Sequence, residues 1–397
     1  MKQKIVLYLL FAAIIAAGCS SRRKKMEDLP FIDIKKNYLE KELRMTDFAN
    51  VSYIYLSSVN TDYLYKGLIN NMYITKNTIV VCDNGSSSIL FFSKDGHPKS
   101  RFNRLGLGPK EYINVTRILY DEDTDDVFVS SDYVDYIQVY SSKGEYKRRI
   151  SLPQYAKVHS LISSDNQSLW MFADKYYKYI IPDAREKNKA NTSYYITYYR
   201  ISKKNGEVLD SINLHTNGVS LISTDSKLNA YQLLNYYRLT KGEDGFFFCN
   251  PEIDTVFLYT KNKSLTPVFC KIPSADNLDP LTVLENVVDA SRYQFFCIST
   301  IQGVGDYPRK FYFRDKKTNE IFLQKIILPD YKGKEFHILA AGAKVACEDE
   351  NDYVYELNLI ELKQANKENR LSGKLKDLVD QLNELEDNNI FMLVHFK

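Results

Sequence analysis

The sequence predicts an all-β fold: a six-bladed β-propeller of antiparallel meander blades, with one C-terminal amphipathic helix and a ring-closing C-terminal strand. Three observations support this prediction. A short apolar segment recurs six times, a polar turn follows most copies one strand later, and the chain ends in a nearly continuous apolar stretch. Repeats of about 40 to 50 residues are typical of propeller blades.

Each copy of the repeat has apolar residues, then one small residue, and usually a polar residue. The small residues are 43 to 50 positions apart, except for one gap of 76. That gap is shorter than two periods, so we expect one blade with insertions at about 176–241. The six copies are Val80–Asp83, Phe128–Ser131, Met171–Asp174, Phe247–Asn250, Phe295–Ile298 and Val345–Glu348.

The turns that close the outer hairpin of each blade also recur. Three of them end in glycine, at Gly96, Gly144 and Gly206, and glycine readily adopts the positive φ that tight hairpins need. The fourth and fifth blades have polar turns without glycine, at 262–264 and 317–319. The repeat therefore predicts that, in successive blades, each copy is an inner strand followed by a second apolar strand, a turn and an outer strand.

The C-terminal region predicts one helix and one strand. Leucines at helical spacing favour a helix at about 361–387 that covers a blade, and 390–396 suits a strand buried on both sides. We expect this strand to join a blade begun near the N-terminus, because pairing the two ends removes exposed sheet edges. The propeller then occupies residues 46–397, after a linker at 19–45.

Residues 1–18 have the features of a secretory signal peptide. The uncharged stretch 5–17 would rise only about 20 Å as a helix, less than a bilayer core of about 30 Å. Small residues before Cys19 resemble the bacterial lipobox, with Ala16 where that motif favours leucine. The resemblance implies a lipidated Cys19 that anchors the chain to a membrane; an ordinary signal peptide with a chance cysteine is the alternative.

The net charge of the chain argues against nucleic acid as a partner. Removing residues 1–18 takes away Lys2 and Lys4, which lowers the formal net charge from +3 to +1. A near-neutral chain has no electrostatic footprint for nucleic acid. The stretch 22–25 is basic, whereas surface-export signals of Bacteroidetes lipoproteins are acidic. That comparison favours an outer-membrane anchor facing the periplasm, and we expect a monomer.

A loop between the first two blades carries the most specific motif. Arg104, Gly106, Gly108, Pro109 and Glu111 match a G-x-G-P-x-E-[FY] pattern, which Tyr112 completes. This loop and the closing segment 388–397 resemble the six-bladed propeller lipoproteins of Bacteroidetes, which are similar in pattern to NHL-repeat propellers. The resemblance implies the fold and the anchor and supplies no catalytic residue. The loop is expected to shape a crossing between blades; a ligand-binding role is the alternative.

The polar residues that follow the small ones are the candidate ligand-binding residues. If they approach the rim of the central channel, they could hold a polar ligand or a cation such as calcium. Alternatively, they cap strand ends by accepting hydrogen bonds from loop amides. These candidates are Asp83, Ser131, Asp174, Asn250 and Glu348.

Cysteine and histidine give no catalytic motif. Four of the five cysteines after residue 19 belong to the repeat, in separate blades, and are expected to be buried free thiols. No zinc-finger spacing or catalytic signature is present, so no catalytic residue, metal ligand or cofactor is assigned.

The sequence therefore leaves two functions of different classes. The favoured hypothesis is a non-catalytic binding or assembly lipoprotein for a peptide, a glycan or an envelope protein. The alternative is a propeller hydrolase or lyase that uses a cation held by carboxylates at the central channel.

Overall fold

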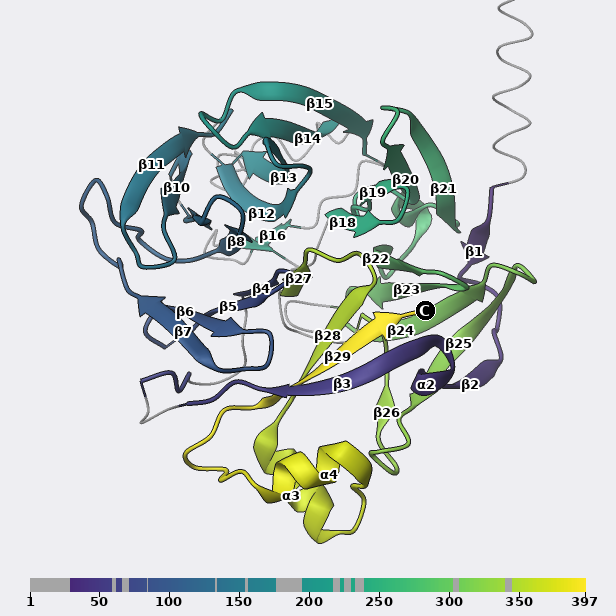
Figure 1. Cartoon of the computed structure of the whole chain (residues 1–397). Helices are drawn as coiled ribbons and strands as arrows, with labels where there is room; N and C mark the ends of the chain where they lie inside the picture. Colours follow the sequence, from purple (N-terminus) through teal and green to yellow (C-terminus); the bar gives the residue numbers. More distant parts are fainter. Residues whose placement is uncertain are drawn as a thin grey trace, which may run out of the picture.

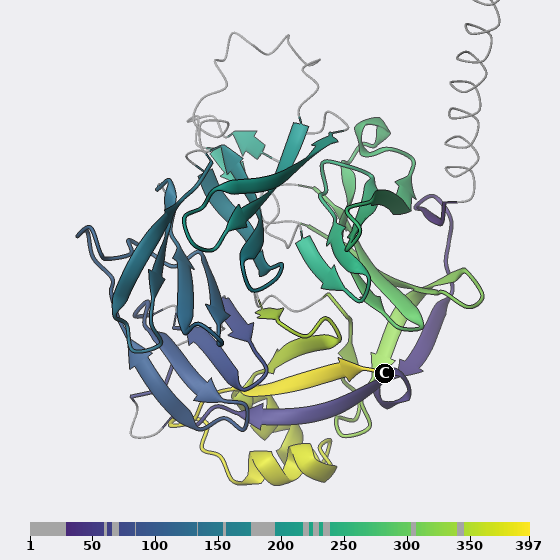
Figure 2. The same ribbon diagram turned by 45° about the horizontal axis from the view of Figure 1, so that its top comes forward.

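The computed structural model describes residues 29–58, 62–65, 71–83, 85–132, 134–153, 156–175, 195–216, 222–224, 230–232, 239–302, 307–339 and 345–397. The strands form six radial sheets around a central axis, which confirms the predicted six-bladed β-propeller (Figures 1 and 2). The signal peptide, Cys19 and most of the expected insertion lie outside the described residues.

The first three blades each contain a four-stranded antiparallel meander that runs outward from the axis in chain order, and the sheet of blade one has a fifth, innermost strand, β27 (Val345–Cys347). Blade one comprises β4 (Asn71–Ile74), β5 (Thr78–Cys82), β6 (Ile89–Ser93) and β7 (Pro98–Phe102). Blade two comprises β8 (Arg117–Asp121), β9 (Asp126–Ser130), β10 (Tyr136–Tyr140) and β11 (Tyr146–Ser151). Blade three comprises β12 (Ala156–Ser163), β13 (Ser168–Lys175), β14 (Tyr195–Ser202) and β15 (Val208–His215).

Blades four and five have the same four strands, and each gains an outermost strand from the N-terminal segment. Blade four comprises β18 (Leu239–Gly242), β19 (Gly245–Phe248), β20 (Thr255–Thr260), β21 (Leu265–Ile272) and the added β1 (Phe31–Asp33). Blade five comprises β22 (Thr282–Ala290), β23 (Tyr293–Thr300), β24 (Arg309–Asp315), β25 (Glu320–Ile327) and the added β2 (Glu40–Arg44). Both added strands run parallel to their neighbours.

Blade six closes the ring. Its sheet has the order β28 (Asp352–Leu357), β29 (Ile390–Phe396) and β3 (Ala49–Tyr55), so the last strand of the chain pairs with an N-terminal strand. The pairing is antiparallel, from Ile390 opposite Tyr55 to Phe396 opposite Ala49. The predicted ring-closing role of the C-terminal strand is confirmed.

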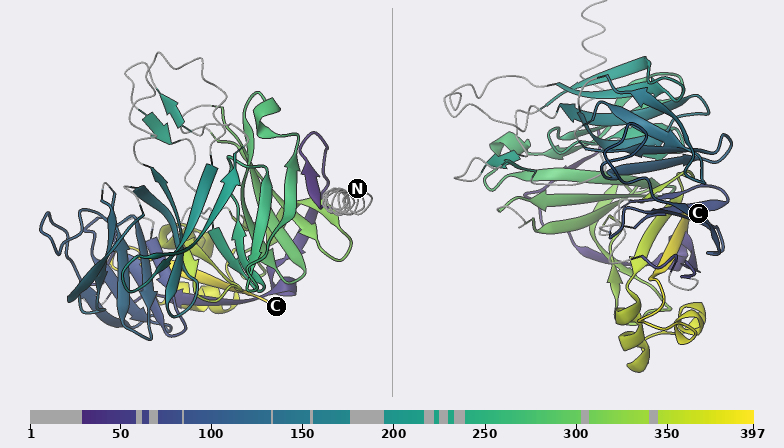
Figure 3. Two further views of the ribbon diagram at one scale, coloured as in Figure 1. Left: turned by 90° about the horizontal axis from the view of Figure 1, so that it is seen from above. Right: turned by 90° about the vertical axis from the view of Figure 1, so that its left-hand side faces the viewer.

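The remaining elements lie between or beside the blades. Figure 3 shows the two longer helices projecting beyond the ring, next to blade six. These elements are α2 (Met45–Phe48), β16 (Ile222–Thr224), β17 (Ala230–Gln232), η2 (Ala275–Asn277), β26 (Glu335–Phe336), β27 (Val345–Cys347), α3 (Leu359–Lys367) and α4 (Gly373–Asp380).

Burial along the strands follows from their place in the ring. The inner strands of a blade face neighbouring blades on both sides, so β5 and β9 are buried at every position. The outer strand β7 alternates between buried or half-buried and exposed residues because one of its faces meets solvent. Apolar residues of the repeat, such as Val80, Phe128 and Met171, share one core across blades one to three.

The outer hairpin turns adopt the predicted left-handed backbone. Gly96, Gly144 and Gly206 have φ values of +90°, +80° and +80°. In the two turns without glycine, Lys263 and Asn319 take the corresponding conformation, both with φ of +62°. The turn geometry is therefore maintained around the ring even where the favoured residue is absent.

The sixth copy of the repeat was assigned to the wrong strand. The first five copies lie on or directly after the second strand of a blade, whereas Val345–Cys347 is the strand before that position. This strand, β27, pairs in parallel with β4 of blade one, and the second strand of blade six is β28. The pattern of apolar, small and polar residues fits both the first and the second strand of a blade. Only the long-range strand pairing shows which of the two a segment forms.

The single helix expected at 361–387 is two helices. The chain leaves α3 through Asn369, with φ of +55°, and enters α4 at Gly373, with φ of +56°. A continuous right-handed helix cannot include these conformations. Leu375 and Val379 are fully buried as expected, whereas Leu385, counted in the apolar stripe, is 83% exposed.

Deleting residues 389–397 should abolish the cooperative unfolding transition, because it removes β29 and separates β28 from β3. Ile390, Met392 and Val394 have no exposed surface, so the deletion also opens the core of blade six. Circular dichroism melting of the mature chain measures this effect. Leu385→Asp, at an exposed position just before the deletion, should melt like the wild type; a truncated chain that did the same would contradict the closure.

Gly96→Ala should destabilise the protein by about 3 kcal/mol, since a left-handed alanine is strained and the added Cβ overlaps its surroundings. That Cβ would lie 1.9 Å from the Tyr55 carbonyl oxygen, where blade one meets β3. Gly333→Ala is the matched control: φ is +74° and no other atom lies within 3.8 Å of the added Cβ. Gly333→Ala should lower the free energy of unfolding by about 1 kcal/mol. Equal losses in urea unfolding would contradict the tight contact.

Candidate functional site

An acidic turn, Glu348–Asp352, crosses the mouth of the central channel. On one side the Glu348 amide donates to the carbonyl of Ile74 in blade one, at 2.8 Å. On the other, Lys241 of β18 donates to the Glu348 carbonyl at 2.9 Å and lies 3.1 Å from the Glu350 carboxylate. Blades one and four are opposite in a ring of six, so this turn spans the axis.

The turn has this position because β27 leaves its own blade. β27 pairs with β4 of blade one, whereas the strand after the turn, β28, pairs within blade six. In an ordinary hairpin the two strands would be neighbours. Here the turn connects two blades, and its sequence includes four acidic residues (Figure 2).

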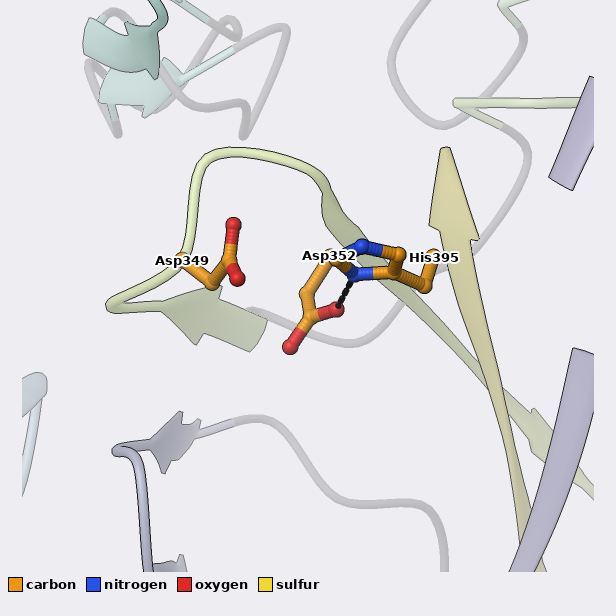
Figure 4. Close-up of side chains that lie close together, drawn as sticks. All are labelled: Asp349, Asp352 and His395. Atoms are coloured by element: carbon orange, nitrogen blue, oxygen red, sulfur yellow. Dashed lines mark hydrogen bonds and ion pairs between the residues drawn. The ribbon is translucent and has the colours of Figure 1, made fainter. Parts of the chain in front are cut away.

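Two aspartates and one histidine meet at the end of this turn. Asp349, Asp352 and His395 each offer one ligand atom, and these atoms lie within 4.8 Å of one another. His395 Nδ1 is 2.9 Å from Asp352 Oδ1, as expected for residues paired directly across β28 and β29 (Figure 4). Asp349 lies in the turn, and its Oδ1 accepts a hydrogen bond from the Asn351 amide. Three different elements thus supply the cluster.

The three side chains differ in exposure. Asp352 is 8% exposed, His395 is 44% exposed and Asp349 lies in solvent. A lysine of blade one, Lys94, lies 3.7 Å from the other oxygen of Asp352. The cluster therefore has one buried carboxylate at its base and an open side toward the channel mouth.

Three of the residues expected at the channel rim have hydrogen-bond partners close to them in sequence or in their own blade. Asp83 accepts hydrogen bonds from the amides of Gly85 and Ser86, both at 3.1 Å, and so caps its own strand. Ser131 donates to the Asn114 carbonyl at 2.6 Å, and Asn250 accepts from the Glu252 amide at 3.0 Å.

The two other rim candidates are Asp174 and Glu348. The side chain of Asp174 lies outside the described residues. Glu348 lies beside Ile74, at one end of β4, whereas Asp83 lies beyond Asn71 at the other end. The placement of Glu348 with the other rim candidates followed from the misassigned sixth repeat.

The loop between blades one and two is held by hydrogen bonds within the loop and to blade two. Glu111 accepts a hydrogen bond from the Gly108 amide at 2.8 Å, and a Cβ on Gly106 would lie only 2.0 Å from its carboxylate. Arg104 donates to the Gly144 carbonyl at 2.8 Å, and the Pro109 carbonyl lies 3.5 Å from a side-chain amide of blade two. The motif residues are therefore engaged in holding the loop.

Tyr112 ties the same loop to blade one. Its hydroxyl accepts from the Arg104 amide at 3.0 Å and donates to the Ser87 carbonyl at 2.7 Å. Burial raises the pKa of Tyr112 to about 12, so the hydroxyl keeps its proton at physiological pH. The loop backbone is thus fixed by contacts on both sides.

Apolar side chains project from this fixed backbone. Leu107 is 90% exposed, Leu105 is 50% exposed and Ile113 is 40% exposed. Sequence reasoning did not identify them, because a leucine among glycines does not reveal which way it points. It also missed Asp349, Asp352 and His395. The run of four acidic residues at 348–352 was the available signal for the two aspartates.

The cysteines are packing groups. Each cysteine of the described residues carries a free thiol, as expected. Burial raises the pKa of Cys82 to about 12 and also raises the pKa of Cys249 and Cys297. A thiol that stays protonated is a poor nucleophile, so these residues contribute to the core and not to chemistry.

Solved structures share this architecture. A "Putative exported protein" from Bacteroides fragilis aligns with a TM-score of 0.62 and 15% identity, over 93% of this chain and 99% of that chain. A member of the DUF4221 family from Bacteroides vulgatus aligns with a TM-score of 0.50 and 11% identity, over 88% of this chain and 97% of the other. At such identities the likeness concerns the fold alone.

Family membership comes from the sequence. No protein of curated function matches the chain. The model of the family described as "6-bladed beta-propeller" matches residues 21–356, which is most of the chain. The chain therefore belongs to this six-bladed β-propeller family, DUF5128.

Proposed function

We propose that this protein is a lipid-anchored, non-catalytic binding module of the cell envelope, which docks a partner protein on the loop between blades one and two. The observation that carries the proposal is Leu107, an apolar side chain that is 90% exposed on a fixed loop. Exposed apolar residues on rigid loops favour binding, because little conformational entropy is lost when a partner covers them.

The contacts of the loop support this role. Gly106 and Gly108 leave room for the Glu111 carboxylate, and Tyr112 anchors the loop from beneath. Arg104 and Glu111 remain exposed, but both are engaged in hydrogen bonds that hold the loop backbone. Leu105 and Leu107 also face solvent, so the fixed loop gives a partner a preformed apolar contact.

The anchor rests on the N-terminal sequence. The proposed signal peptide ends at residue 18, and Leu29, at the outer edge of blade four, is ten positions after Cys19. An extended segment of that length spans at most about 35 Å. The membrane proposed is the outer membrane with the propeller in the periplasm, and exported relatives of the same fold support an envelope location.

Cys19→Ala should release the protein from membrane fractions, because the acyl chains attach to that cysteine and each buried methylene contributes about 0.8 kcal/mol to anchoring. Ultracentrifugation after metabolic labelling with a fatty acid measures both effects. Ser20→Ala, next to the proposed acylation site, should leave anchoring unchanged. Fatty-acid labelling of Cys19→Ala would contradict the lipidation.

A photo-crosslinking residue placed at Leu107 should give a discrete covalent adduct with one envelope protein in living cells. The matched control is the same residue at Leu385, which is 83% exposed but lies beside the helices of blade six. Mass spectrometry of the adduct identifies the partner, and Leu105→Asp should reduce its yield at least tenfold. Equal adducts from both positions, or none from position 107, would contradict this docking site.

A further inference from the structure

We propose that Asp349, Asp352 and His395 form a zinc site that fixes the acidic turn across the channel mouth. This inference goes beyond the proposed function, because the cluster belongs to blade six and the channel, and the docking loop lies between blades one and two. It rests on the geometry of the donors, on the burial of one carboxylate and on where the turn runs.

The donor geometry fits a small divalent ion. Zinc bonds to nitrogen and oxygen are about 2.1 Å long, so tetrahedral ligand atoms lie about 3.4 Å apart. The pair His395 Nδ1 and Asp352 Oδ1 is 2.9 Å apart, and all three donors lie within 4.8 Å. For tetrahedral ligation the His395–Asp352 pair would open by about 0.5 Å and the exposed Asp349 carboxylate would turn toward the same ion.

The two inner ligands are held in place before any ion binds. Asp352 and His395 are direct partners across the antiparallel strands β28 and β29. The amide of Phe396, next to His395, donates to the Asn351 carbonyl at 2.8 Å, which fixes the turn against the strand. An ion therefore meets a nearly formed site and orders only one side chain, that of Asp349.

A separate electrostatic observation points to a cation. The Asp352 carboxylate is 8% exposed, yet its nearest lysine, Lys94, is 3.7 Å away and also donates to the Thr75 carbonyl at 3.2 Å. A buried carboxylate is stabilised by paired charges, and Asp352 has two partners, Lys94 and His395 Nδ1 at 2.9 Å. A cation bound here would replace the hydrogen bond to His395 by coordination and add a full positive charge. Asp349, the exposed member of the cluster, comes from the turn beside the Asp352–His395 pair (Figure 4).

The donor set selects the metal. Imidazole nitrogen is a ligand for zinc and other first-row transition ions, whereas calcium takes six to eight oxygen ligands. Two carboxylates and one imidazole are also too few for calcium. Zinc accepts three protein ligands and leaves a fourth position for water or for a group of a bound molecule.

Zinc would have a structural consequence at the channel. Asp349 belongs to the turn, which is stretched between blades one and six and touches blade four through Lys241. Binding through Asp349, Asp352 and His395 would fasten this turn to the two central strands of blade six. The bound ion would thus hold the turn, and the carboxylates it carries, in a single conformation.

The test is zinc titration of the untagged mature chain, by isothermal calorimetry and native mass spectrometry. We expect one zinc ion per chain and a higher melting temperature with zinc. Asp349→Asn should weaken zinc binding by about tenfold or more, and His395→Asn by about a hundredfold. Asp349→Asn keeps the oxygen that accepts from the Asn351 amide, so this variant should retain the wild-type fold.

Two matched controls carry the same chemical changes outside the cluster. Glu350→Gln removes a carboxylate from the same turn, and His97→Asn removes a histidine that lies 3.6 Å from Asp95 on the surface. Both should bind zinc like the wild type. The proposal is overturned if the wild type binds no zinc, if calcium binds more tightly, or if His395→Asn and His97→Asn bind zinc equally.

Discussion

The pairing of β29 with β3 is the constraint on which the rest of the structure depends. A propeller blade has no core of its own, because each sheet is covered by the two sheets beside it. The stack can bury all of its inner strands only if it closes on itself. Here closure joins residues 390–396 to residues 49–55 through a seven-residue ladder, so blade six is built from strands of both ends of the propeller.

Closure also explains how the channel mouth is built. β27 joins the sheet of blade one, whereas the next strand in the sequence, β28, belongs to blade six. The connection to β28 must then cross from one blade to another, and it does so over the axis. The cluster at Asp349, Asp352 and His395 exists because the end of that connection returns to the strand that closes the ring.

Local pattern was sufficient for the fold, and insufficient for the site. Alternation, turns and a period of about 47 residues predicted the blades and the closing strand. The triplet at Val345–Cys347 has the same apolar pattern as a second strand, and only its partner β4 shows that it is a first strand. The sequence left two roles open for Asp83, a rim ligand or a strand cap, and the amides of Gly85 and Ser86 donate to its carboxylate as the cap requires.

The N-terminal strands have a mechanical consequence. β1, β2 and β3 cover the outer edges of blades four, five and six, and they are three, five and seven residues long in that order. A pull that enters at residue 29, from a chain tethered upstream, loads β1 first and reaches the closing ladder last. The two shorter strands can peel away and rejoin under load, which shields the one seam whose rupture would open the toroid.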